Sequence, residues 1–162
     1  MAGALGCSLG GMVTRILLSR SGIRSAEKRK LRRTLRELDR AGRRLSGLIR
    51  EDALAYKRLV AAQPRGGPPL LKAKCSAIDC PIEICRRSVE GMKLLKVLLK
   101  RTGPYLGSDV RAGLALLRGA FDSAMEMALV NVQGSGLGPA GRALQSELGR
   151  LDRDARRLHG NA

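Results

Sequence analysis

The chain has 162 residues, of which 44% are apolar, so it is long enough and apolar enough to fold around a core of its own. Aromatic residues make up only 2%, which argues against β-sandwiches and against stacking platforms for nucleic-acid bases, since both depend on aromatic rings. Thirty-one Lys and Arg against 14 Asp and Glu give a net charge of +17. This charge favours a polyanionic partner such as nucleic acid, an acidic membrane or a polycarboxylate substrate.

The first predicted element spans residues 2–19 and is apolar on nearly all sides, with many small residues. Its uncharged run ends at Arg15 and is shorter than the roughly 20 residues that cross a bilayer. We therefore predict a buried helix and no membrane partner. A targeting role for the Arg-rich, acid-poor start of the chain is the alternative.

The second predicted helix runs from Ser25, a residue type that caps helices, to Gln63. Its apolar residues recur at alternating steps of four and three, which predicts a packed seam. In chain order the seam consists of Leu31, Leu35, Leu38, Gly42, Leu45, Ile49, Asp52, Tyr56 and Leu59. Nine Lys and Arg occupy the remaining surface between residues 28 and 44. We interpret them as a solvated face, with RNA binding through phosphates as the alternative.

Three more helices are predicted after a Pro- and Gly-rich break at residues 64–69. Residues 70–101 form the third, which Pro81 is expected to break or kink. The fourth begins at the capping pair Ser108–Asp109, carries two apolar stripes and ends near Asn131. The fifth, residues 139–158, is amphipathic. No stretch alternates with the period of a strand.

The sequence therefore predicts an all-α fold: a bundle of about five long helices in a single domain that spans residues 1–162. The first and fourth helices are apolar on more than one face, and five helices of one copy can hardly cover both. We therefore expect a homodimer.

Three polar residues interrupt apolar faces and are candidate site residues: Asp52, Asp109 and Asn131. A carboxylate on a buried seam is costly unless it is paired, so such residues often serve a function. Each also has a structural interpretation. Asp52 could pair with an arginine of a neighbouring helix, Asp109 could cap a helix, and Asn131 could end one.

Metal and disulfide chemistry find little support in the sequence. The four cysteines, at positions 7, 75, 80 and 85, follow no secretory signal, so we expect reduced thiols and a cytoplasmic protein. The last three are spaced by five residues, which places successive side chains about 140° apart on a helix. The one histidine, His159, lies near the C-terminus. We predict no metal site.

The order of several short motifs resembles the cyclodeaminase/cyclohydrolase family of folate enzymes. The similar segments are Ala2–Val13, Glu51–Tyr56, Cys80–Cys85, Gly107–Val110 and Ala128–Val132. Family members usually begin with a Pro- and Gly-bearing segment before the first helix, and Met1 stands where that segment is expected. Asp52, Asp109 and Asn131 all fall within the similar segments.

The resemblance implies an all-helical homodimer that uses a one-carbon tetrahydrofolate as substrate and no metal. The family's reactions close a formimino group to the methenyl bridge with release of ammonia, or hydrolyse that bridge. Asp52 or Asp109 would then act as acid and base, Asn131 would bind the pterin or Asp109, and Tyr56 and Ser108 would contact the folate. The alternatives are a non-catalytic dimeric relative that binds a ligand or partner, and a basic RNA-binding module.

Overall fold

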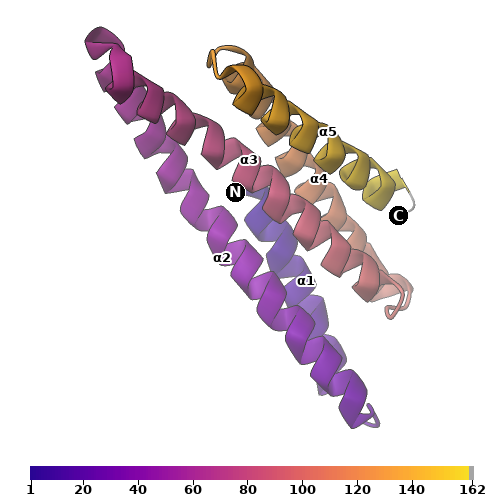
Figure 1. The fold of residues 1–162 in the computed structure, drawn as a ribbon. Coiled ribbons are helices and arrows are strands. Elements are labelled where there is room, and N and C mark those ends of the chain that lie inside the picture. Colours follow the sequence, from indigo (N-terminus) through magenta and orange to yellow (C-terminus); the bar gives the residue numbers. More distant parts are fainter. Residues whose placement is uncertain (161–162) are drawn as a thin grey trace.

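The computed structural model describes residues 1–160, which form five long helices joined by short turns (Figure 1). They are α1 (Ala2–Ser19), α2 (Ser25–Ala62), α3 (Gly67–Leu99), α4 (Pro104–Gln133) and α5 (Gly138–Gly160), with the 3-10 turn η1 (Gln63–Arg65) between α2 and α3. No residue of this range lies in a strand, so the predicted all-α fold is confirmed.

The helices share one core. α1 packs between α2 and α4, α3 packs against the same two helices, and α5 lies on α3 and α4. The apolar faces of all five contribute to a single cluster of buried side chains, in which Phe121, Leu38 and Leu114 are almost fully enclosed. Burial of these faces supplies most of the stability, because isolated helices of this length are marginal in water.

α1 and α4 approach each other through glycine. A Cβ built on Gly6 would lie 2.7 Å from the carbonyl oxygen of Gly113, and one built on Gly113 would lie 3.0 Å from the carbonyl oxygen of Gly6. Backbone oxygens cannot move aside as a flexible side chain can. The small residues of α1 therefore allow two helix backbones to touch. By length and composition α1 is also the one helix within residues 1–160 that could cross a membrane.

α1 begins about half-way along the bundle (Figure 1). At its start, a Cβ on Gly3 would lie 3.2 Å from both Leu45 of α2 and Ala120 of α4. α2 and α4 continue well beyond these two residues, and α3 runs beside them. The upper ends of α2, α3 and α4 are therefore not covered by α1.

Because α1 covers only one half of the bundle, part of the seam predicted for α2 is wrong. Leu31, Leu38 and Leu45 are buried as expected, but beyond Leu45 the buried residues are Leu48 and Ala55, and the predicted Ile49 and Tyr56 are exposed. With α1 absent from this half, α2 buries the side that faces α3.

Two helix boundaries also differ from the predictions. α3 continues through Pro81 without a break, because packing on both sides of the helix outweighs one lost backbone hydrogen bond. α4 begins at Pro104 with Gly103 as its N-cap, so Ser108–Asp109 is not the cap pair. Proline suits the first helical position because its missing N–H would have no partner there.

Candidate functional site

A groove opens at the end of the bundle that α1 does not cover. It has a volume of about 370 Å³ and lies among α2, η1, α3 and α4. Leu59, Gln63, Leu70, Lys74, Ala77, Val130, Asn131 and Gly134 line it. We call it the end groove. Its lining combines apolar side chains with a few polar groups, as small-molecule sites do.

Asn131 links two helices that line the end groove, α4 and α3. Its side-chain Nδ2 donates a hydrogen bond of 2.9 Å to the carbonyl oxygen of Ala77. In an α-helix that carbonyl would accept from the N–H of residue 81, which is a proline and has none. Asn131 of α4 therefore replaces the donor that Pro81 removes from α3. Its Oδ1 makes no hydrogen bond within residues 1–160, and the residue lines the end groove.

Asp52 lies near the same segment of α3. It is half-buried, and its charge is among the influences that, after burial, raise the pKa of the Cys80 thiol. Asp52 thus lies near Cys80, and Asn131 contacts Ala77. The structure brings these two predicted residues to neighbouring turns of α3. Tyr56, one turn further along α2, is 66% exposed.

Asp109 and Ser108 lie far from this group within one chain. They occur near the start of α4, whereas Asn131 lies near its end. At 1.5 Å per residue the separation from Asp109 to Asn131 is about 33 Å. A direct bond between them, which the resemblance implied as one role of Asn131, is therefore excluded within a single copy. The Ser108 hydroxyl donates to the carbonyl oxygen of Tyr105, a local helical contact.

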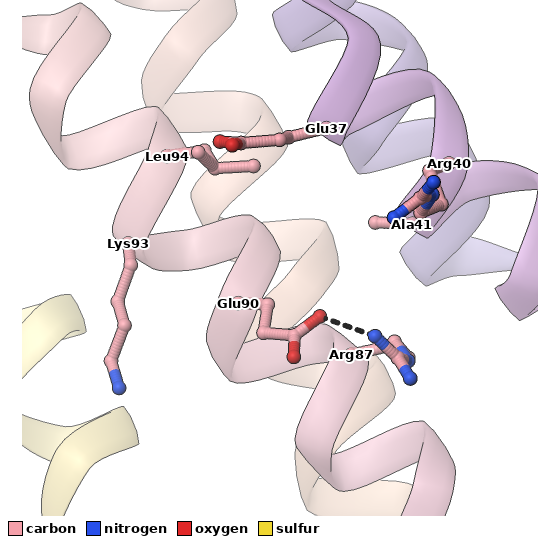
Figure 2. A pocket seen from close by; sticks show the side chains of 7 residues that line it. All are labelled: Glu37, Arg40, Ala41, Arg87, Glu90, Lys93 and Leu94. Carbon is pink, nitrogen blue, oxygen red and sulfur yellow. Dashed lines mark hydrogen bonds and ion pairs between the residues drawn. The ribbon is translucent and has the colours of Figure 1, made fainter. Parts of the chain in front are cut away.

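A second groove, of about 400 Å³, lies between α2 and α3 and contains none of the predicted residues (Figure 2). Most of its charges are already paired. Arg87 binds Glu83 and Glu90, and Lys93 extends towards α5, where it pairs with Asp154. This groove therefore offers little uncompensated charge to a ligand.

The sequence did not single out Gln63 and Lys74 of the end groove. Gln63 borders the Pro- and Gly-rich break, and Lys74 lies in the part of the third helix before Pro81; neither interrupts a predicted apolar seam. The Lys74 amino group donates to the carbonyl oxygen of Gly134 at 3.3 Å, so it links α3 to the turn after α4.

The described residues show no metal-ligating cluster. Within residues 1–160, no three His, Cys, Asp or Glu side chains gather as metal ligands would. Burial raises the pKa of the Cys7 thiol to about 11 and that of Cys85 to about 12, so both thiols stay protonated at neutral pH.

Comparison with known proteins agrees with this architecture. The solved structure of formiminotetrahydrofolate cyclodeaminase from Thermotoga maritima superposes with a TM-score of 0.92 at 19% identity, over 98% of this chain and 80% of that one. At this identity the match shows the fold. No curated protein matches the chain in sequence. The family model for formiminotransferase-cyclodeaminase matches residues 1–135, and the chain therefore belongs to the formiminotransferase-cyclodeaminase family.

Proposed function

We propose that the protein acts in folate one-carbon metabolism as a cyclodeaminase that closes 5-formimino-tetrahydrofolate to the 5,10-methenyl form with release of ammonia. Family membership supports the reaction class. The observation that carries the proposal is that Asn131 lines the end groove and contacts Ala77 of α3, while Asp52 lies near Cys80, three residues further along the same helix. Hydrolysis of the methenyl bridge is the second reaction of this type; there a base takes a proton from the attacking water and an acid protonates the ring nitrogen that leaves.

The reaction requires an acid and a base close to the substrate's N5 and N10. The N10 lone pair attacks the formimino carbon, and a base takes the N10 proton. The formimino nitrogen then gains protons and leaves as ammonia with the electrons of its bond to carbon. A positioned carboxylate can accept the first proton and return it to the departing nitrogen. Asp52 and Asp109 are the proposed carboxylates, and the free Oδ1 of Asn131 is the proposed acceptor for the pterin.

A second copy of the chain would complete this site. The outward face of α4 exposes mostly small and apolar residues, with Glu126 as a charge on it and Asp122 at its edge; the uncharged residues include Ser108, Ala112, Ala115, Gly119, Ser123, Met127 and Val130. The neighbouring face of α1 exposes Leu5, Met12 and Ile16. In a protein with a net charge of +17, a face without arginine or lysine is suited to self-association.

Symmetry connects this face to the site. In a twofold dimer with antiparallel α4 helices, the two copies cross at the midpoint of the contact. Residues 109 and 131 are equidistant from Ala120, and a Cβ added to Gly119 beside it would have no heavy atom of a neighbouring residue within 4 Å. Such a dimer would place Asp109 of the partner subunit opposite Asn131. This arrangement explains how residues about 33 Å apart in one chain could serve one site.

Turnover of formimino-tetrahydrofolate, followed by appearance of the methenyl chromophore, tests the proposal. We expect Asp52→Asn and Asp109→Asn to lower turnover at least 100-fold with unchanged helicity, as expected for loss of an acid–base group. Asp39→Asn, which changes a carboxylate of α2 far from the end groove, is the matched control. Full activity in both site variants would overturn the assignment. Absence of turnover of either folate by the wild-type protein would favour a non-catalytic relative.

Mixing the two inactive variants tests the shared site. Random exchange of subunits between Asp52→Asn and Asp109→Asn dimers would regenerate one intact site in each hybrid, so about a quarter of the wild-type activity should return. If both carboxylates served the site from the same subunit, mixing would restore nothing.

A further inference from the structure

The outward face of α2 carries a line of arginines. Arg29, Arg32, Arg36, Arg40 and Arg43 follow one another at steps of three or four residues, so they lie on one side of the helix. All five are exposed. We call these five residues the arginine stripe.

The charges of the arginine stripe are uncompensated. None of its five members forms an ion pair with the described part of the chain. The acids nearby bind other partners: Glu27 pairs with Arg101, Glu37 with Arg33, and Asp39 with Arg15. Glu90, which lines the second groove together with Arg40, pairs with Arg87. Glu37 and Asp39 still border the shallow hollow of about 430 Å³ between the arginines, and they lower its potential only in part.

The surroundings of the arginine stripe limit what it can bind. No large apolar side chain is exposed between residues 25 and 47, so an amphipathic insertion into a membrane has no anchor. No aromatic residue occurs there either, so single-stranded bases find no ring to stack on. These absences leave a hydrophilic, regularly spaced polyanion as the ligand that fits.

The dimensions match a nucleic-acid duplex. From Arg29 to Arg43 the helix rises about 21 Å, and one strand of B-form DNA presents about six phosphates over that length. Guanidinium groups bind phosphate oxygens through paired hydrogen bonds. We propose that the arginine stripe binds the phosphodiester backbone of double-stranded nucleic acid without reading its base sequence.

Fluorescence anisotropy with a labelled 20-base-pair duplex tests the proposal on the full-length protein. Duplex DNA and duplex RNA, each in two unrelated sequences, are titrated between 50 and 200 mM KCl. Five phosphate contacts predict a slope of log K against log salt of about −4.5 for DNA, a loss of several hundredfold in affinity over this range. Affinity should be equal for both sequences, and the two duplex types show which backbone is preferred.

The decisive comparison uses two triple variants with the same loss of charge. Arg32→Gln, Arg36→Gln and Arg43→Gln together should reduce the slope to about −2 and weaken binding at least tenfold. Arg142→Gln, Arg150→Gln and Arg153→Gln change three exposed arginines of α5 that also form no ion pair within residues 1–160. These should change affinity less than threefold. Circular dichroism confirms folding, because glutamine preserves helix propensity.

Three results would overturn the proposal. Equal weakening by both triple variants would mean that the overall charge, and not the arginine stripe, attracts the duplex. Tighter binding to the single strand than to the duplex would mean that bases are contacted. Binding to vesicles of anionic phospholipid, with no binding to either duplex, would mean that the stripe faces a membrane.

Discussion

The outward faces of α2 and α4 belong to the same bundle but have opposite chemistry. α2 exposes arginines that no carboxylate neutralises, and it exposes no large apolar side chain between residues 25 and 47. α4 exposes small and apolar residues along a face with no cation, from Ser108 to Val130. Each helix buries its other face in the common core. The comparison teaches that the inward faces decide the fold, whereas the outward faces decide which partner each side of the bundle can accept.

The largest expected effect comes from a charge placed on the α4 face. Gly119→Arg should dissociate the proposed dimer, because the twofold axis would bring two guanidinium groups together. The dimer dissociation constant, measured by analytical ultracentrifugation, should rise more than 100-fold. The monomer should fold normally, since the position is open. Ser46→Arg adds the same charge to α2 and should leave the oligomeric state unchanged; equal sedimentation of all three proteins would argue against this dimer.

Alanine substitutions at two glycines should have opposite effects on stability, because one lies at the inward contact of α4 with α1 and the other on the outward face of α4. Gly6→Ala, opposite Gly113, should lower the free energy of unfolding by about 1–3 kcal/mol, because the new methyl group overlaps a backbone carbonyl. Gly119→Ala should raise it by about 0.5–1 kcal/mol through helix propensity if the face is not in a dimer contact. Chemical denaturation of the dissociated protein measures both changes. The two changes in the free energy of unfolding should have opposite signs. A stabilising Gly6→Ala would contradict the close contact of α1 and α4.

The hydrogen bond from Asn131 to the Ala77 carbonyl gives this residue a structural role that can be measured apart from catalysis. Asn131→Ala should cost about 1–2 kcal/mol of stability, because it leaves that carbonyl without a donor. In a Pro81→Ala background the helix supplies its own N–H, so the same change should cost roughly 1 kcal/mol less. A double-mutant cycle by denaturation measures this coupling; additive effects would mean that the bond contributes nothing.

The smallest expected effect is a difference in stability: loss of an arginine's ion pair should cost more than loss of an unpaired arginine. Arg86 binds both carboxylate oxygens of Glu147, at 2.7 and 2.9 Å, and holds α5 on α3. This hydrogen bonding lowers the pKa of Glu147. Glu147→Gln should therefore cost about 0.5–1 kcal/mol at pH 7 after allowance for solvent screening. Arg36→Gln in the arginine stripe should change stability by less than about 0.5 kcal/mol.

The pH dependence of the Glu147 effect follows from the direction of its pKa shift. A carboxylate with a lowered pKa in the folded state stabilises the fold above its unfolded pKa, and that contribution is lost as the pH falls through the folded value. Thermal denaturation should therefore show the wild type and Glu147→Gln converging in the acid range below the ordinary value of 4.5. A difference that persists under strong acid would have another cause.

Helix number and helix identity could be predicted from the sequence, because long apolar rhythms and Gly/Pro breaks are local signals. The error at Ile49 and Tyr56 arose because the rhythm of α2 is compatible with two faces, and only the starting level of α1 decides between them. Of the break or kink expected at Pro81, the break does not occur, and Asn131 supplies the donor that the proline removes. This donor lies 50 residues further along the chain, so local sequence signals do not reveal it. For the site, Asp52 and Asn131 lie near neighbouring turns of α3, whereas the relation of Asp109 to them depends on a second copy and stays a prediction.

The bond between Asn131 and α3 also has a consequence for how this sequence can change over time. A lineage that first loses Pro81 regains the helical N–H and is then free to vary position 131 at little cost. A lineage that loses Asn131 first must pass through a protein with an orphaned carbonyl. The order of the two substitutions is therefore not neutral. Natural variants should combine proline at position 81 with a side-chain donor at position 131 far more often than independent change would produce.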